Sequence, residues 1–395
     1  MKNIINTFQE LTNIQKALVL IILATVFYGL STSLSYSIFS KASFKGILPL
    51  ETSNGASLPS PTSIVTEDPT QPKTESCPLN GSMHTKAAKD AWIARRPLAV
   101  MIENHLEARP QSGLSYADIV YEAVAEGGIT RFMALFYCNL GYIQVGPVRS
   151  ARTYYIDWLS EYDALYAHVG GANSPGPADA LGQIIKYKIK DLNQFSIGFP
   201  VFWRDYQRLD HLVATEHTMY STTQKLWEVG AKRGWTATNS AGLRWDAKFT
   251  PWKFKDEKPG GTTNKITVNF WESQSDYTVE WSYDTVSNTY KRKSGGSAQM
   301  DLDNNTQLSA KVIVVQFEKE SNANDGYPGN VHLLYATIGS GKALFFQDGE
   351  VSEGKWIKSS RTGRSKYVDS KGQEIIFNKG QIWIQTVPEG SKVTY

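Results

Sequence analysis

Two segments near the N-terminus limit which part of this chain can fold. Residues 17–40 carry no charge, and their first part, ALVLIILATVFYGL, is strongly apolar. A stretch of this length can span a bilayer as one helix, and we favour an uncleaved anchor over a cleaved signal peptide because apolar residues continue to Phe39. Residues 41–76 are rich in Ser, Thr and Pro, which predicts a disordered linker. The folded domains are therefore expected within residues 77–395.

The expected topology is a single-pass membrane protein with its globular domains outside the cytoplasm. Residues 1–16 form the short cytoplasmic N-terminus in this prediction. Lys2 and Lys16 precede the apolar segment while Lys41 and Lys45 follow it, so the positive-inside rule barely selects an orientation. The linker and the cysteine pair favour an extracytoplasmic C-terminus, which predicts a tethered protein of the bacterial cell envelope.

The chain has two cysteines, Cys77 and Cys138. The first lies where the predicted linker ends, and the second lies in an apolar run. Outside the cytoplasm such a pair can form one disulfide, which would join the start of the folded region to an interior strand. The alternative is two unrelated free thiols.

Composition and pattern predict an α+β fold in two parts. Apolar residues make up 41% of the chain, enough for two cores. Apolar runs alternate with helical patterns in residues 77–241, whereas residues 242–395 contain short β-branched and aromatic runs separated by Gly, Asn and Asp turns. We therefore predict an α+β domain with a mixed sheet, followed by a smaller β-rich domain. Because 41 basic and 38 acidic residues are interspersed, nucleic acid is not an expected partner.

A hairpin is predicted around Gly127 and Gly128. The apolar runs 119–126 and 129–138 flank the two glycines, and this arrangement is typical of two strands joined by a tight turn. A helix over 119–126 is the alternative, but its Val, Ile and Tyr residues favour a strand.

Charged residues of this hairpin are candidates for a site. With a two-residue turn, Glu126 lies opposite Ile129, and Glu122, Glu126 and Arg131 then share one face. Glu122 and Glu126 are the candidate acid or base residues, and Arg131 is a candidate ligand-binding residue. The alternative is an ion pair on a half-exposed sheet face.

The motif GPVRSAR, residues 146–152, precedes a helical pattern. Ser150 is expected to cap that helix, and Arg149 and Arg152 would stand beside free backbone N–H groups. This composition suits a phosphate or carboxylate ligand. Alternatively, carboxylates of this domain hold the arginines: Asp157, Glu161 or Glu122.

Histidines give weaker signals. His168 ends a short predicted strand and is a third catalytic candidate, although a histidine bonded to a nearby carbonyl is commoner. Asp210-His211 and Glu216-His217 match no established zinc spacing. We therefore expect neither a metal nor a cofactor.

The second part adds two ambiguous features. Five tryptophans could stack on sugar rings, yet large aromatic residues in a β domain usually fill its core; they are Trp252, Trp271, Trp281, Trp356 and Trp383. Five basic residues suggest a local positive surface or a solvated strand face: Lys355, Lys358, Arg361, Arg364 and Lys366.

Several motifs make the chain resemble the bacterial YerB lipoprotein family of unknown function. They are RPLAVMIEN, ARPQSGLSYADIVYEAVAEGGITRFMALF, VGPVRSARTYYIDW and YDALYAHVGG, followed by GSGKALFFQDG and GKWIKSSRTGRSKYVDSKGQEIIFNKGQIWI. The resemblance covers about residues 96–384. It singles out Glu122, Glu126, Arg131, Arg149, Arg152 and Arg361 without implying a reaction. The chain lacks a lipobox cysteine, and FWRDYQRLDHLVATEHTMYS departs from the family pattern.

Three functions are compatible with these features. The leading hypothesis is a module that binds an anionic envelope component, such as peptidoglycan or an attached polymer, through Arg149 and Arg152. The second is a wall-glycan hydrolase or lyase that uses Glu122 or Glu126 as acid or base. The third is a scaffold for another membrane protein.

Overall fold

The computed structural model describes residues 70–139, 141–326 and 332–395, with a few isolated positions before them. The predicted N-terminus at 1–16, the anchor at 17–40 and most of the linker lie outside this described part. Within it, no helix is both long and apolar enough to cross a membrane.

The folded region begins earlier than predicted. Lys73–Ser76, expected to be disordered, forms strand β1, which pairs antiparallel with β2 (Met83–Thr85). The disulfide at the following residue, Cys77, fixes this strand next to the folded core. The linker prediction was therefore wrong for these last residues.

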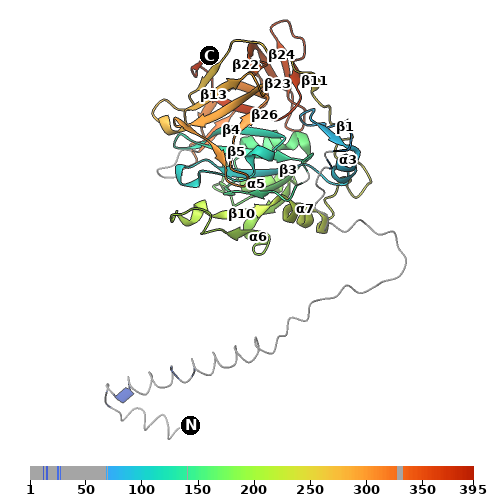
Figure 1. The fold of residues 1–395 in the computed structure, drawn as a ribbon. Helices are drawn as coiled ribbons and strands as arrows, with labels where there is room; N and C mark the ends of the chain where they lie inside the picture. Colours follow the sequence, from blue (N-terminus) through green and yellow to red (C-terminus); the bar gives the residue numbers. More distant parts are fainter. Residues whose placement is uncertain are drawn as a thin grey trace, which may run out of the picture. The chain divides into compact units, whose positions relative to one another are not determined.

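A ten-stranded mixed sheet organises the fold (Figure 1). Its order is β24 (Lys366–Asp369), β23 (Glu350–Lys358), β22 (Gly339–Gln347), β19 (Val312–Glu318), β26 (Ile382–Pro388), β4 (Ile119–Glu126), β5 (Ile129–Phe136), β3 (Leu98–Glu103), β7 (Leu165–His168) and β8 (Lys190–Asn193). Parallel pairs such as β26–β4 and β3–β7 occur beside antiparallel ones such as β4–β5. The predicted α+β class with a mixed sheet is confirmed.

The remaining elements surround this sheet. The second sheet has β15 (Ser297–Ala298), β14 (Thr289–Ser294), β13 (Val279–Asp284), β12 (Lys265–Val268) and β27 (Val393–Thr394), with β18 (Ser309–Ala310) on β14. The small sheets are β6 (Gln144–Val145), β10 (Met219–Thr222) and β9 (Trp203–Arg204), then β11 (Lys253–Lys255) with β25 (Ile376–Asn378), β16 (Met300–Asp301) with β17 (Thr306–Gln307), and β20 (Glu320–Asn322) with β21 (Leu333–Tyr335). The helices are α3 (Lys86–Trp92), α4 (Thr153–Leu159), α5 (Ala180–Lys186), α6 (Gln194–Ile197) and α7 (Thr223–Lys232). Short 3-10 helices are η1 (Leu106–Ala108), η2 (Leu114–Tyr116), η3 (Ser160–Tyr162), η4 (Thr215–His217) and η5 (Ser275–Tyr277).

The two predicted parts of the chain share one sheet. Strand β26 from residues 242–395 lies parallel to β4 from residues 77–241, with Gln385 beside Glu122. The orange and red strands in Figure 1 thus continue the sheet formed by the teal hairpin. The predicted boundary after residue 241 therefore divides the sequence into two segments, but the strands of both segments pack around one common core. Trp281 and Trp383 are fully buried there with their rings 5.2 Å apart, as expected for core residues.

The predicted hairpin is present, but its register differs from the prediction. Glu126 pairs with Ile129 as expected, and a bulge then shifts the pairing, so that Glu122 lies opposite Phe132 rather than Met133. Directly opposed residues share a face, and an extra residue in one strand reverses the faces beyond it. Glu122 therefore lies on the face toward the second sheet, whereas Glu126 and Arg131 lie on the face toward α4. The prediction of one shared face was wrong.

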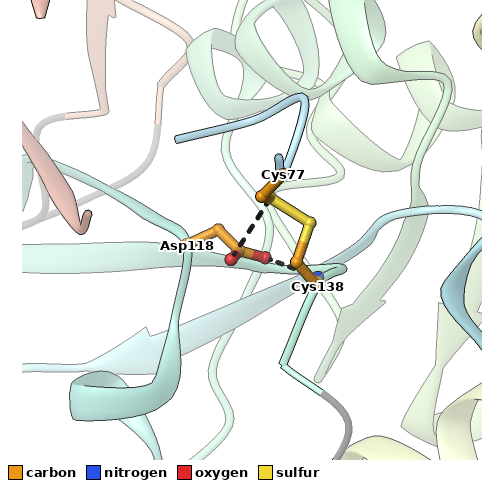
Figure 2. A group of neighbouring side chains, drawn as sticks. All are labelled: Cys77, Asp118 and Cys138. Atoms are coloured by element: carbon orange, nitrogen blue, oxygen red, sulfur yellow. Dashed lines mark hydrogen bonds between the residues drawn. A yellow bond between two sulfur atoms is a disulfide. The ribbon is translucent and has the colours of Figure 1, made fainter. Parts of the chain in front are cut away.

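The predicted disulfide joins Cys77 to Cys138, which lies two residues after the end of β5. The carboxylate of Asp118 lies beside it (Figure 2) and accepts the backbone N–H groups of Tyr137 at 2.7 Å and Cys138 at 3.0 Å. Burial raises the pKa of Asp118 to about 6, although these two N–H groups oppose the shift. The three side chains lie close enough to hold a metal ion, but sulfurs joined to each other are not thiolate ligands.

Removal of this disulfide is expected to lower the free energy of unfolding by about 2–4 kcal/mol, because it closes a long loop in the unfolded chain. The bridged residues are 61 positions apart. Urea unfolding of a Cys77→Ser, Cys138→Ser variant beside the oxidised wild type measures the loss. Reductant should destabilise only the wild type. Equal stability of the oxidised wild type and the variant would contradict the prediction.

Candidate functional site

Charged residues converge at the end of the sheet where β3 and β4 finish and β5 begins. The loop before α4 and the 3-10 helix η4 reach the same place. We call this group the edge cluster and define it as Glu103, Glu126, Arg131, Arg149, Arg152 and His217. The structure thus brings together Glu126, Arg131, Arg149 and Arg152 from the predicted site and adds Glu103 and His217.

Two arginines share the carboxylate of Glu126. Arg131 donates from Nη2 to Oε1 at 3.0 Å, and Arg152 donates from Nη2 to Oε2. The alternative that a carboxylate holds Arg152 is therefore correct, but the carboxylate is Glu126 rather than Asp157, Glu161 or Glu122. Burial alone would raise the pKa of Glu126, but the two guanidinium groups outweigh it and lower the pKa to about 2. A carboxyl group that stays ionised at all physiological pH values is poorly suited to act as a general acid.

Glu103 organises the other half of the edge cluster. Its Oε1 accepts from Nε of Arg149 at 2.9 Å, and its Oε2 lies 2.8 Å from Nδ1 of His217. The His105 ring stacks on that of His217 with centroids 4.6 Å apart. Glu103 and His217 are buried, whereas the Arg149 side chain keeps 24% of its surface exposed. Arg149 is therefore the arginine of the cluster that a ligand reaches most easily.

The arginines of the edge cluster differ in how many of their donors are used. The Nε atoms of Arg131 and Arg152 are buried with no acceptor among the described residues, whereas Arg149 is partly exposed and donates only from Nε, to Glu103. A third carboxylate, Glu107, lies 3.8 Å from Nε2 of His217, so three arginines stand beside three glutamates. Burial and the charge of Arg131 lower the pKa of Arg152, although Glu126 acts in the opposite direction. An anion that contacts Arg149 would accept hydrogen bonds from its Nη groups, which have no acceptor among the described residues.

The expected helix cap differs from the observed one. Arg152 is the N-cap residue of α4, and no side chain caps the helix. Ser150 instead offers its carbonyl oxygen to Nη1 of Arg131 at 3.0 Å. The loop turns into the helix two residues later than the Ser150 cap requires, so that assignment was wrong. Ser150 is half-buried beside the cluster, and a ligand role for it stays a prediction.

Glu122 lies apart from the edge cluster in a polar core network. Oε1 accepts from Arg292 at 2.7 Å and from Thr130 at 2.9 Å, while Oε2 accepts from Trp383 at 3.2 Å and from Gln385 at 2.9 Å. The Glu122 and Arg292 side chains are both fully buried. Substrate has no open path to this carboxylate as it is placed here, so its arrangement suits a structural ion pair better than catalysis.

His168 is also fully buried, and both of its ring nitrogens have partners. Nδ1 lies 2.7 Å from the carbonyl oxygen of Gly170, and Nε2 lies 2.8 Å from the Asp191 carboxylate. Neither nitrogen is free to exchange a proton with a ligand. This geometry favours the structural interpretation of His168.

Glu103 and His217 carried weaker sequence signals. Glu103 ends an apolar run, which is where a buried strand delivers polar groups to a sheet edge. His217 lies in the segment that departs from the family pattern, and 114 residues separate it from Glu103. A contact over that distance in sequence leaves no periodic pattern.

The fold defines a class of protein: a disulfide-bonded α+β unit in which two segments of the sequence share one sheet. Two family models match the chain: the N-terminal domain of "Protein of unknown function (DUF3048)" at residues 84–236 and its C-terminal domain at residues 266–384. The chain belongs to this family, as the resemblance in its motifs predicted.

One relative and one solved structure extend this result. The chain is 32% identical over 299 residues to "Putative lipoprotein YerB" of Bacillus subtilis (strain 168), which covers 75% of this chain and 82% of the relative. The crystal structure of the YerB protein from Bacillus subtilis matches with a TM-score of 0.68 at 27% identity, covering 82% of this chain and all of that one. The name of the relative supports a membrane-associated protein of the bacterial envelope. It gives no support to the single-pass helix, because a lipoprotein is held by lipid.

Proposed function

We propose that the protein binds an anionic group of the bacterial cell envelope at the edge cluster. The partly exposed guanidinium group of Arg149, whose Nη donors have no acceptor among the described residues, carries this proposal. Guanidinium groups suit carboxylate and phosphate ligands because their planar donors match two oxygens at once. Peptidoglycan peptides and attached wall polymers contain such groups, and an envelope protein would meet them.

A wall-glycan hydrolase or lyase has less support. Glu122 is sealed in the core, and Glu126 is held ionised by two arginines. A scaffold role would leave the edge cluster as a set of structural ion pairs. The same experiment separates these alternatives from ligand binding.

The test is sedimentation of the purified full-length protein with purified peptidoglycan, with and without its attached anionic polymer. Arg149→Gln should raise the dissociation constant about tenfold or more, because a hydrogen bond between charged groups contributes roughly 1.5–3 kcal/mol. Lys86→Gln is the matched control, since it removes one positive charge from a side chain that is 77% exposed on α3. Thermal unfolding checks that both variants stay folded.

Each outcome has a distinct meaning. Binding that is weakened only by Arg149→Gln supports the proposal, and the arm without polymer shows which component carries the anion. Equal binding by both variants refutes a role for the edge cluster. Release of soluble wall fragments would favour the hydrolase, and absence of binding would favour the scaffold.

A further inference from the structure

A second basic site lies where the two halves of the chain meet. A cavity of about 270 Å³ is bounded by η3, the residues before β8, the segment after residue 241 and the turn between β23 and β24. We call it the seam cavity. The lining residues that matter here are Tyr187, Lys188, Lys190, Lys248, Phe249 and Arg361.

The carboxylates near the seam cavity are already neutralised. Glu161 is fully buried and accepts from Lys358 and Arg364, which explains why these two basic residues do not form the positive surface predicted for them. Asp163 pairs with Arg96 and Lys190. Four cations line the cavity beside these two paired carboxylates: Lys188, Lys190, Lys248 and Arg361.

Arg361 is held in place while most of its donors remain unused. Its Nη1 donates to Oγ of Ser160 at 2.6 Å, and the guanidinium group lies over the Tyr187 ring, 4.2 Å from the centroid. In residues 70–139, 141–326 and 332–395, no carboxylate lies within ion-pair distance of Arg361, Lys188 or Lys248. Lys188 and Lys248 are exposed at the surface. These three cations are therefore available to a ligand.

We infer that the seam cavity binds a phosphate group carried by a sugar. A guanidinium group held in place beside two exposed lysines suits a phosphate dianion. Tyr187 and Phe249 are half-buried, and the part of each ring that its neighbours leave uncovered provides apolar surface for a sugar ring. The volume is slightly below the usual range for ligand pockets, roughly 300–1,000 Å³, so it limits the ligand to about one sugar unit. This inference does not depend on the edge cluster.

Titration calorimetry of the full-length protein with glucose 1-phosphate tests the inference, with glucose, glycerol 3-phosphate and inorganic phosphate as the other arms. Glucose 1-phosphate should bind tightest and glucose should not bind. Tighter binding of glycerol 3-phosphate would overturn the sugar assignment and indicate a lipid headgroup as the source. Equal affinity for inorganic phosphate would also overturn it, because the rings would then contribute nothing.

Variants locate the binding. Arg361→Gln and the double variant Lys188→Gln, Lys248→Gln should each weaken glucose 1-phosphate binding about tenfold or more, for the charged hydrogen bonds they remove. The double variant changes only exposed residues, so it remains informative if Arg361→Gln unfolds. Lys355→Gln, an exposed change on β23 outside the cavity, is the control.

Glucose 1-phosphate binding that is lost in Arg149→Gln and kept in the seam-cavity variants would place the phosphate at the edge cluster and overturn the inference, so this result stays distinct from a failure of the proposed function. Undiminished binding in both seam-cavity variants, or no binding of glucose 1-phosphate to the wild type, would overturn the inference.

Discussion

Replacement of Glu122 by glutamine is expected to lower the free energy of unfolding by about 3–5 kcal/mol, because it leaves a buried cation without its partner. Arg292 is fully buried, and Glu122 is the carboxylate that pairs with it. Nε of Arg292 donates to the amide oxygen of Gln299 at 2.6 Å, and the rings of Phe132, Trp281 and Trp383 surround the guanidinium group. Burial already lowers the pKa of Arg292, and Glu122 counteracts this shift.

The hydrogen bonds make glutamine a poor substitute in either orientation. Both oxygens of Glu122 face donors: Arg292 and Thr130 on one side, Trp383 and Gln385 on the other. An NH₂ group in place of Oε2 would point at the N–H donors of Trp383 and Gln385, and in place of Oε1 it would point at the Arg292 guanidinium group, so either orientation loses at least one buried hydrogen bond. The cost of unpaired buried donors adds to that of the unpaired charge.

Urea unfolding of three variants measures this effect. Glu280→Gln is the matched control, because it breaks a partly exposed pair with Lys265 on the second sheet and should cost no more than about 1 kcal/mol. Adding Arg292→Met to Glu122→Gln should recover part of the loss, since the ion pair is then replaced by an apolar side chain among aromatic rings. A Glu122→Gln variant as stable as Glu280→Gln would show that the pair contributes little.

This prediction also bears on the catalytic hypothesis. If Glu122→Gln loses stability, any loss of activity in that variant reports unfolding rather than chemistry. Arg149→Gln is the more informative variant for function, because its side chain is partly exposed and Glu103 retains His217 as a partner.

Local features of the fold could be predicted because their signals lie within a few residues of each other. The run 119–126 matches β4, and the two glycines mark the turn. Strands β13, β19 and β22 lie in residues 242–395, where short β-branched and aromatic runs predicted strands. Each run alternates or concentrates apolar residues over one strand length, and this pattern does not depend on the rest of the chain.

The bulge in the hairpin could not be predicted from that pattern. It adds one residue to β4 between Val124 and Glu126, and the period of two makes one residue enough to exchange the faces. For this reason the sequence pattern does not distinguish Glu122 from Glu126. In the structure one belongs to a core ion pair and the other to the edge cluster.

Contacts between residues far apart in the chain could not be predicted from the sequence pattern either. Glu122 and Arg292 are 170 residues apart, and the parallel contact of β26 with β4 joins segments that the composition separates. A continuous hydrophobic run indicates that a strand is buried on both faces, but it does not indicate which strand lies beside it in the sheet. The sequence therefore predicted which charged residues belong to the candidate site. The partners of these residues, and the separation of Glu122 from the edge cluster, are set by the tertiary structure.

Glu318→Gln is expected to stabilise the protein in alkaline solution and to have little effect near pH 5. Glu318 ends β19 and is buried with 1% of its surface exposed. Burial, together with the nearby charge of Asp157, raises its pKa to about 8, although Lys358 opposes the shift. The carboxyl group thus keeps its proton in the folded state at neutral pH.

The direction of the pH dependence follows from this raised pKa. Between the ordinary glutamate pKa of about 4.3 and about 8, the folded state holds a proton that the unfolded state has released. Stability therefore falls as the pH rises through this window, and the loss is complete above pH 8. A shift of between three and four pKa units corresponds to roughly 4–5 kcal/mol. Glutamine stays neutral and has no such loss.

Urea unfolding of the wild type, Glu318→Gln and the control Glu353→Gln at pH 5, 7 and 9 tests this expectation. Glu353 lies on β23 with 56% of its side chain exposed, so its replacement should not alter the pH profile. Thiol ionisation does not complicate the alkaline measurements, because both cysteines of the chain are in the disulfide. The stability of Glu318→Gln relative to the wild type should increase steadily from pH 5 to pH 9. A difference that stays constant across this range would mean that Glu318 is already ionised in the folded protein at pH 5, with Lys358 compensating its charge.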